Sequence, residues 1–389
     1  MWYNHCMKIL VGLSGGVDSA VAAYLLKEQG YQVECAFMRN WDSLTNNDIL
    51  GNPTLDEAIC TQEQDYNDAV EVAKRLDLPL HRIDFIQEYW DDVFTTFLKE
   101  YASGRTPNPD ILCNKYIKFD AFFKFADEHG FDKVATGHYA RVVHYDDHSE
   151  MIKAKDSSKD QSYFLCQISQ DALRRTLFPL GEIEKKEVRE IALKLDLNVA
   201  KKKDSTGICF IGERNFRQFL RNYLPAKSGK IVDIDTKQVL GDHIGVLYYT
   251  LGQRKGLDIS AHEGPWFVVG KDVYTNELFV AKGEDHPWLK SDACRVNQLN
   301  WFNPIDFSKP LVCHAKFRYR QKDQDVVIQM INDQELWVSY PQGIPAVTPG
   351  QEAVFYLNDV CLGGGVIDEI YRDNKSLSSI LAEVKNASL

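Results

Sequence analysis

The feature that most constrains this chain is a glycine-rich turn between an apolar segment and an amphipathic one. The turn, Ser14-Gly15-Gly16-Val17-Asp18-Ser19, directly follows the apolar run Ile9 to Leu13. Apolar residues then recur at helical spacing, at Val17, Ala20, Val21, Tyr24 and Leu25. A strand, a tight turn and a helix start are therefore predicted. Such a turn exposes backbone N–H groups at the positive end of a helix, so it can cradle a phosphate.

The residues of this loop exclude one class of phosphate-binding site and favour another. The chain has no Gly-Lys-Ser/Thr here, so the loop is not the P-loop of kinases and GTPases. Ser-Gly-Gly-x-Asp-Ser instead resembles the pyrophosphate loop of enzymes that split ATP into AMP and pyrophosphate. Such enzymes adenylate an oxygen to make it leave. The alternative is a glycine turn that only starts a helix, but two hydroxyls and an aspartate also flank these glycines.

Length and composition predict a soluble globular protein of two or three domains. The chain has 389 residues, 44% of them hydrophobic and 26% charged. No apolar run approaches the ~20 residues of a membrane helix, and the first residues lack the features of a signal or transit peptide. The nine cysteines are scattered, without a Cys-x-x-Cys pair, which indicates free thiols and a reducing compartment. We therefore expect a cytoplasmic protein; the alternative, the mitochondrial matrix, is disfavoured.

The charge is unevenly distributed. The net charge is −11, which argues against binding nucleic acid over the whole surface. Residues 174–230, however, hold 14 Lys or Arg against 7 Asp or Glu. A local excess of this kind is what a phosphate backbone attracts. The alternative is a solvated, charged helix face.

The first half of the chain alternates strand and helix signals, which predicts an α/β domain with a parallel sheet covered by helices on both faces. Strands are expected over Lys8 to Leu13, Tyr31 to Met38, Leu80 to Phe85 and Lys133 to Thr136. Helices are expected over Val17 to Gly30, Asp65 to Leu76 and Lys118 to Glu128. Ligands of such sheets gather at the carboxyl ends of the strands, where the glycine loop falls.

From about residue 213 the pattern becomes that of β-structure. Val326 to Ile331 and Leu336 to Tyr340 flank a polar turn and predict a hairpin, and Ala353 to Leu357 and Val360 to Ile367 predict further strands. Gly363-Gly364-Gly365 indicates a bend or bulge. We predict a catalytic α/β domain at 7–212, a small, mostly β central domain at 213–284, a C-terminal β-barrel at 285–371 and a polar tail at 372–389, helical or frayed.

A second dense motif is Thr106-Pro107-Asn108-Pro109-Asp110-Ile111-Leu112-Cys113-Asn114-Lys115. Two prolines stiffen it and hold Asp110 and Cys113 in a defined relation. A cysteine at a helix start can have its thiolate stabilised by the helix dipole, with help from Lys115. Asp110 is then a candidate general acid/base beside a nucleophile. The alternative is a buried structural cysteine after a proline turn.

The third motif is Asp204-Ser205-Thr206-Gly207-Ile208-Cys209-Phe210-Ile211-Gly212, directly after Lys201-Lys202-Lys203. Neighbouring cations favour a thiolate at Cys209. The alternative is a small apolar residue in a turn.

These motifs, with Ala135 to Arg141, Lys159 to Leu165 and Phe317 to Gln321, occur in an order that resembles the tRNA-specific 2-thiouridylases, the tRNA-uridine 2-sulfurtransferases of bacteria and mitochondria. The resemblance covers about residues 7 to 370. It implies an N-type ATP-pyrophosphatase domain, similar to the adenine nucleotide alpha hydrolases, before the central domain and the barrel. The stretch 43–60 is longer than the usual connection, and neither its role nor that of Cys60 follows from the family.

The resemblance also implies roles for individual residues. ATP contacts are implied for Gly12, Leu13, Ser14, Gly15, Gly16, Val17, Asp18, Ser19, Met38 and Gly137. The flipped target uracil would meet Asn108, Pro109 and Asp110, with Asp110 as acid/base. Cys113 is implied as the nucleophile, and Cys209 as the carrier of the persulfide sulfur. Further tRNA contacts are implied for His138, Lys159, Asp160, Gln161, Arg318, Tyr319, Arg320 and Gln351.

The function that this resemblance implies is ATP-dependent 2-thiolation of the wobble uridine, position 34, of tRNA. Mg²⁺ would accompany ATP, a desulfurase or relay protein would supply the persulfide, and we expect a monomer; no protein metal site is predicted. Two alternatives stay open at this point. A ligase that amidates a small carboxylate would share the glycine loop but not need Cys209 or the barrel. A non-catalytic tRNA-binding protein would need neither Asp110 nor the cysteines.

Overall fold

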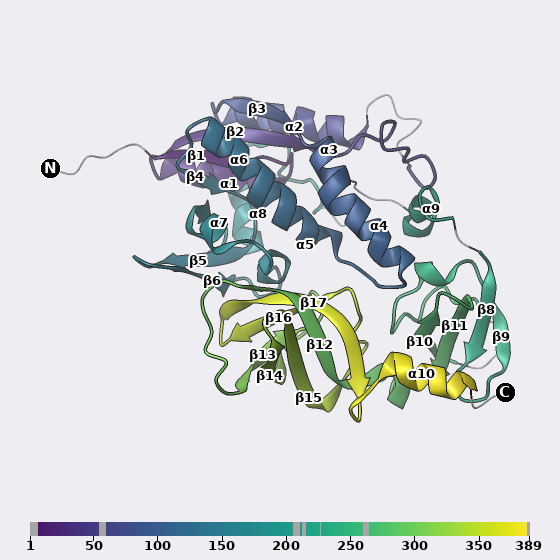
Figure 1. Ribbon diagram of the computed structural model, residues 1–389. Helices are drawn as coiled ribbons and strands as arrows, with labels where there is room; N and C mark the ends of the chain where they lie inside the picture. Colours follow the sequence, from purple (N-terminus) through teal and green to yellow (C-terminus); the bar gives the residue numbers. More distant parts are fainter. Residues whose placement is uncertain are drawn as a thin grey trace.

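The computed structural model describes residues 7–53, 60–204, 211, 215–225, 227–259 and 264–386, with side chains to residue 383. Figure 1 shows an α/β part at the top, a β-barrel below it and a small sheet beside the barrel. No helix in the described ranges has both the length and the apolar character needed to cross a membrane.

The first sheet is parallel throughout, as predicted, in the order β3-β2-β1-β4-β7. Its strands are β1 (Lys8–Gly12), β2 (Gln32–Arg39), β3 (Leu80–Asp84), β4 (Lys133–Ala135) and β7 (Thr176–Leu177). Three consecutive residues of the central strand β1, Ile9, Leu10 and Val11, are fully buried. A strand buried on both faces is expected where helices cover both sides of a parallel sheet.

Helices cover the two faces of this sheet with separate cores. Ile9 and Val11 pack with α1 (Val17–Glu28), α2 (Thr61–Arg75) and α8 (Lys185–Lys194), whereas Leu10 packs with the aromatic core on the other side. Successive side chains of a strand point to opposite faces, which explains this division. The second face is covered by two helical runs: α3 (Ile86–Glu88), η1 (Tyr89–Phe94) and α4 (Thr95–Ala102), then α5 (Pro109–Cys113), η2 (Asn114–Ala121) and α6 (Phe122–Glu128).

The second helical run begins earlier than predicted. The sequence indicated a helix from Lys118, but α5 begins at Pro109 and continues through the wide turns of η2 into α6. Asn108 caps this helix and Pro109 fills its first position, where a missing N–H costs nothing. The residues that the sequence analysis interpreted as a stiff loop therefore form the start of a helix.

The small sheet has the order β10-β11-β8-β9. Its elements, with neighbouring helical turns, are α9 (Phe216–Arg221), β8 (Gly229–Asp233), β9 (Val239–His243), η4 (Val246–Tyr248), β10 (Trp266–Asp272) and β11 (Glu277–Lys282). The end of the chain returns to it: Leu381 of α10 (Leu377–Asn386) packs in one core with Val232 and Phe279. The helical alternative for the polar tail is thus confirmed.

The barrel contains the predicted hairpin and strands, and also β12, β13 and β18, for which no range was expected from the sequence. Its elements are η5 (Pro287–Leu289), β12 (Lys290–Trp301), β13 (Leu311–Lys316), β14 (Gln324–Asn332), β15 (Glu335–Pro345), β16 (Glu352–Leu357), β17 (Val360–Arg372) and β18 (Lys375–Ser376). Pairing of β12 with both β15 and β17 closes it, and the register shifts near the predicted glycine bulge. The added hairpin, β5 (Ala140–His144) and β6 (Ser149–Lys153), pairs with β17, so the α/β part extends the barrel sheet.

Candidate functional site

The glycine loop lies between the buried strand β1 and the N-terminus of α1. Gly15 has φ of 72°, in the region that favours glycine, and Gly16 is the N-cap of α1. The Ser19 hydroxyl ties the loop together, because it accepts from the Ser14 N–H at 3.1 Å and donates to the Gly16 carbonyl at 3.1 Å. The twelve-residue α1 therefore directs its positive end at a fixed loop.

Several residues that were predicted to contact the nucleotide lie next to this loop. A Cβ on Gly137 would lie 2.7 Å from the Ser19 nitrogen, so the end of β4 touches the first turn of α1. A Cβ on Gly12 would lie 3.2 Å from Cε of Met38, at the end of β2. By contrast, a Cβ on Gly16 would meet only the Ser14 hydroxyl, at 3.4 Å, among the described atoms. The residues around the loop are closely packed, whereas the start of the helix faces open space. This arrangement suits the binding of a phosphate chain at the helix N-terminus.

Asp18, in the first turn of α1, is held by two groups that the sequence did not single out. Lys185 Nζ lies 2.7 Å from both carboxylate oxygens, and the Tyr139 hydroxyl donates to one of them at 2.8 Å. Burial and the charge of Asp18 raise the pKa of Tyr139, so this hydroxyl remains a donor at neutral pH. Lys185 stands 167 residues from Asp18 in the chain, so no local pattern could reveal the pair.

The predicted basic stretch is partly neutralised by carboxylates around the glycine loop. Lys202 Nζ donates to the Gly15 carbonyl at 2.9 Å and pairs with Asp65 and Asp68 at 2.7 and 2.5 Å. Lys185 and Arg189 both pair with Asp204. Lys185, Arg189 and Lys202 therefore have carboxylate partners, and Lys202 also braces the loop, while the tRNA contact expected of this stretch stays a prediction.

The Asn108–Cys113 motif forms the start of α5. The Asn108 side chain accepts from the N–H groups of Asp110 and Ile111 at 3.2 and 3.4 Å, so it caps the helix. Asp110 is partly exposed, whereas Cys113 is fully buried. Because the helix begins at Pro109, Cys113 lies beyond its first turn, where the dipole effect fades. The expectation of a thiol at a helix start is thus wrong, and Lys115 donates to Gln167 at 3.2 Å.

This motif is joined to the barrel. Gln351 donates to the Thr106 carbonyl at 2.7 Å, and the Thr106 N–H donates to the Pro349 carbonyl at 2.9 Å. Asn114 donates to the Phe164 carbonyl at 2.8 Å, and the Phe164 ring lies 4.3 Å from that of Tyr319. The structure therefore brings the predicted residues Tyr319 and Gln351 to the segment that carries Asp110 and Cys113.

Two of the predicted barrel contacts differ in availability. Arg318 is half-buried and donates to the Leu251 carbonyl and the Thr348 hydroxyl, both at 2.8 Å, and burial lowers its pKa. Arg320 is exposed, and its guanidinium lies 5.4 Å from the centre of the Tyr319 ring. Arg320 is thus exposed on the barrel, while Arg318 joins the barrel to the central domain.

The predicted contacts on the α/β side also have protein partners. Asp160 is 5% exposed and accepts from the Ala154 N–H at 3.0 Å and the Ser162 hydroxyl at 2.9 Å, a position that does not favour an RNA contact. Gln161 accepts from the Tyr139 N–H at 3.0 Å. His138 lies 2.8 Å from the Thr136 hydroxyl, and burial, with the charge of Lys118, lowers the pKa of His138 well below its usual value. Lys159 pairs with Asp204 at 2.8 Å.

Cys209 lies outside the described residues, so its relation to Cys113 stays a prediction. The longer connection near residues 43–53 contacts α9 and the residues directly after it, which lie far away along the chain. Asn222 and Leu50 exchange two hydrogen bonds, of 2.9 and 3.0 Å, and Tyr223 donates to the Asn46 carbonyl at 2.7 Å. A Cβ on Gly51 would lie 2.7 Å from Cβ of Gln218. This connection therefore holds α9 in place.

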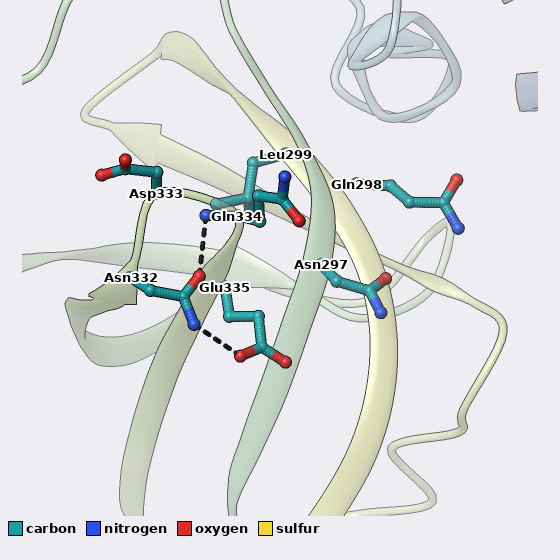
Figure 2. A pocket seen from close by; sticks show the side chains of 7 residues that line it. All are labelled: Asn297, Gln298, Leu299, Asn332, Asp333, Gln334 and Glu335. Atoms are coloured by element: carbon teal, nitrogen blue, oxygen red, sulfur yellow. Dashed lines mark hydrogen bonds between the residues drawn. The ribbon is translucent and has the colours of Figure 1, made fainter.

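The barrel contains a hollow at one of its turns. This hollow of about 490 Å³ lies at the turn between β14 and β15, beside β12. Figure 2 shows the side chains that line it. Its Asn332 accepts from the Gln334 N–H and donates to Glu335, so these groups close the turn. In the described part of the chain, no three His, Cys, Asp or Glu side chains gather as metal ligands.

Family models match nearly the whole chain in three consecutive pieces. They are described as a tRNA methyl transferase HUP domain at residues 7–213, a tRNA methyl transferase PRC-barrel domain at 217–282 and an aminomethyltransferase beta-barrel domain at 291–367. These models agree with the α/β part, the small sheet and the barrel of the fold.

The relatives are similar over almost their full length, and each is a tRNA-specific 2-thiouridylase MnmA. Identity is 55% to the protein of Mycoplasma mycoides, over 94% of this chain and 99% of that protein. It is 56% to that of Mesoplasma florum, over 93% and 98%, and 50% to that of Staphylococcus epidermidis, over 97% and 100%. A solved NMN synthetase from Francisella tularensis is 19% identical with a TM-score of 0.33, over 53% of this chain and 69% of that one, too weak a likeness to carry an argument. The chain belongs to the family of the tRNA-specific 2-thiouridylases.

Proposed function

We propose that this chain catalyses the ATP-dependent 2-thiolation of the wobble uridine, position 34, of tRNA. The observation that carries the proposal is the glycine loop, with open space at the start of α1, in a chain that matches a 2-thiouridylase over 94% of its length. Family membership supports the substrate and the sulfur transfer, and the loop geometry supports the use of a nucleotide.

The glycine loop and the end of β4 would bind ATP, which supplies the adenylyl group that turns the uracil 2-oxygen into a leaving group. Loop N–H groups and the start of α1 would hold the phosphates, and Met38 and Gly137 would line the nucleoside. Asp18 would help to hold Mg²⁺. Pyrophosphate leaves in this step, and the adenylated oxygen later leaves as AMP.

Sulfur transfer would then use the two cysteines. The outer sulfur of a persulfide on Cys209 bonds to ring carbon 2 as AMP leaves, and Cys113 attacks the inner sulfur. The electron pair of the broken S–S bond stays on the transferred sulfur, which leaves 2-thiouridine and a Cys113–Cys209 disulfide. Alternatively, Cys113 first releases the outer sulfur as sulfide. A thiol reductant then reduces the disulfide. Asp110 acts as the general acid/base of the reaction.

The surroundings of this reaction complete the proposal. The partners are tRNA and a protein that carries a cysteine persulfide, either a desulfurase or a sulfur-relay protein. We infer a cytoplasmic monomer, in which the α/β domain ends at residue 212 and the central domain at residue 284. Because Cys113 is buried, it becomes reactive only when the packing around α5 changes on tRNA binding.

Formation of AMP in the presence and absence of tRNA tests the proposal. Radiolabelled ATP with Mg²⁺ should yield AMP that depends on a tRNA with uridine at position 34, and on no small carboxylate. AMP that instead depends on ammonia and a small carboxylate would indicate the ligase. Binding of tRNA without any AMP would indicate a non-catalytic protein.

A further inference from the structure

Arg105, just after α4, ties the chain that leads into residues 108–113 to the barrel. Its Nε donates to the Glu100 carboxylate of α4 at 2.6 Å. Its Nη1 donates to the carbonyl and the carboxylate of Asp368 at 3.0 and 3.1 Å, and its Nη2 to the Ile367 carbonyl at 3.1 Å, both on β17. The side chain is 19% exposed. A planar guanidinium that is bound at all three nitrogens has one position and one direction.

The neighbours of Arg105 contact the other two domains. A Cβ on Gly104, whose φ is 80°, would lie 2.8 Å from Cγ1 of Val273, in the turn between β10 and β11 of the small sheet. A Cβ on Gly350 of the barrel, whose φ is 93°, would lie 2.7 Å from the Thr106 nitrogen. Glycine permits both close approaches. The small sheet and the barrel therefore both contact the α/β part at residues 104–106.

Between Arg105 and Asp110 the chain has little conformational freedom. Pro107 and Pro109 have a fixed φ, and the residue before each proline is restricted as well. The Asn108 side chain also accepts from the Asp110 N–H at 3.2 Å. A shift of the Arg105 backbone therefore moves the start of α5, and Asp110 with it.

We propose that Arg105 is a positioning residue that holds Asp110 in a fixed relation to the barrel, and so to the tRNA. The inference rests on the proposed function, in which Asp110 is the acid/base and the barrel meets tRNA. In this role Arg105 acts only through Asp110 and contacts neither substrate. Its contribution is geometric, because a displacement of about 1 Å near a reacting group can lower a rate by about 100-fold.

The test is single-turnover formation of AMP, with ATP and protein in excess over a tRNA that has uridine at position 34. Arg105→Gln should lower this rate by about 10–100-fold. Calorimetry should show unchanged binding of a non-hydrolysable ATP analogue, because the glycine loop lies between β1 and α1. Arg105→Lys should restore only part of the rate, since an ammonium keeps the charge beside Glu100 but cannot reproduce the forked contacts with β17.

The matched control is Arg295→Gln. Arg295 is a second arginine on the Asp368 carboxylate, at 2.6 Å, but it approaches from β12 within the barrel. Its loss should leave the AMP rate unchanged. Thermal unfolding shows whether each variant is folded, and Arg105→Lys takes the place of Arg105→Gln if the latter does not fold.

A double variant distinguishes the positioning of Asp110 from a general structural effect. When Arg105→Gln is added to Asp110→Asn, the rate should fall by no more than about twofold, because the group to be positioned is already lost. A further fall as large as that in the unmodified background would overturn the inference. So would an unchanged rate in Arg105→Gln, or a loss of analogue binding equal to the loss of rate. If the unmodified protein forms no AMP with tRNA, the proposed function is overturned instead.

Discussion

At the scale of single residues, the site depends on the space around each glycine: some glycines are packed against other atoms, and others face open space. The sequence predicted the loop because its signal is local: a buried strand, two glycines and an amphipathic helix. It could not predict Lys185, Tyr139 or Asp204, because their contacts join residues more than a hundred positions apart or depend on how α8 packs on α1. The buried position of Cys113 agrees with the alternative that the sequence left open, a buried cysteine after a proline turn.

Gly16→Val is expected to abolish AMP formation while the protein stays folded. Its φ of −108° suits any residue, and the new side chain would occupy the open space at the start of α1. Gly15→Ala is the contrast: with φ of 72° and a Cβ 2.2 Å from the Asp65 carbonyl, it should destabilise the fold by about 1–3 kcal/mol. Thermal unfolding and AMP release distinguish the two; normal AMP release in folded Gly16→Val would refute the loop assignment.

Glu352→Gln should remove a pH dependence of stability. Glu352 is 3% exposed, and burial raises the pKa of its carboxyl well above the usual value, against the opposing charge of Lys115. The folded state then keeps a proton that the unfolded chain loses above about pH 4.3. Stability therefore falls as pH rises from there towards the folded pKa, by up to about 1.4 kcal/mol per pH unit.

Urea unfolding at pH 5 and pH 8 measures this effect. The loss of stability between the two pH values should be smaller in Glu352→Gln than in the unmodified protein. The exposed Glu284→Gln is the control and should leave the difference unchanged. An equal loss in all three proteins would show that Glu352 is ionised in the folded state.

At the scale of elements, the junction between α5 and the barrel matters most. Sequence patterns predicted the hairpin of β14 and β15 and the strands after it, because alternation and turn residues are local signals. They missed that the β5–β6 hairpin joins the barrel, since pairing with β17 brings together residues about 210 positions apart. Arg318 and Arg320 are two positions apart, yet burial gives them different roles.

Arg320→Ala should weaken tRNA binding and lower the salt dependence of log K by about one, the slope of one phosphate contact, without loss of stability. Arg318→Ala should lower the free energy of unfolding by about 1–2 kcal/mol, because the Leu251 carbonyl and the Thr348 hydroxyl lose a donor. Filter binding over a salt series and urea unfolding check both. Unchanged affinity and slope in Arg320→Ala would show that tRNA does not dock on this side of the barrel.

At the scale of the whole molecule, the α/β part supplies the nucleotide loop and the barrel supplies a wall beside α5. The resemblance implied an ATP-pyrophosphatase-type domain, a central domain and a barrel in this order, and the family models confirm these three domains. The arrangement of the charged side chains in the basic stretch could not be predicted. It depends on ion pairs between segments that are far apart in the sequence, and composition does not reveal these pairs. The proposed reaction requires Cys113 and Cys209 to act together.

The two thiols should separate in a single turnover. Cys209→Ser should lose both persulfide loading and thiolation, whereas Cys113→Ser should load a persulfide on Cys209 and transfer none of it. Without reductant, the unmodified protein should show a Cys113–Cys209 disulfide by peptide mapping, which requires Cα atoms within about 7 Å. A persulfide on Cys113, or no bond between the pair, would reverse the proposed roles.

The most direct test of the central claim is nucleoside mass spectrometry of tRNA. The tRNA is incubated with the protein, ATP, Mg²⁺ and a persulfide donor labelled with heavy sulfur, and AMP is measured in the same samples. We predict labelled 2-thiouridine at position 34, formed in step with AMP and absent without ATP. AMP without labelled 2-thiouridine, or label in another nucleoside, would contradict the account.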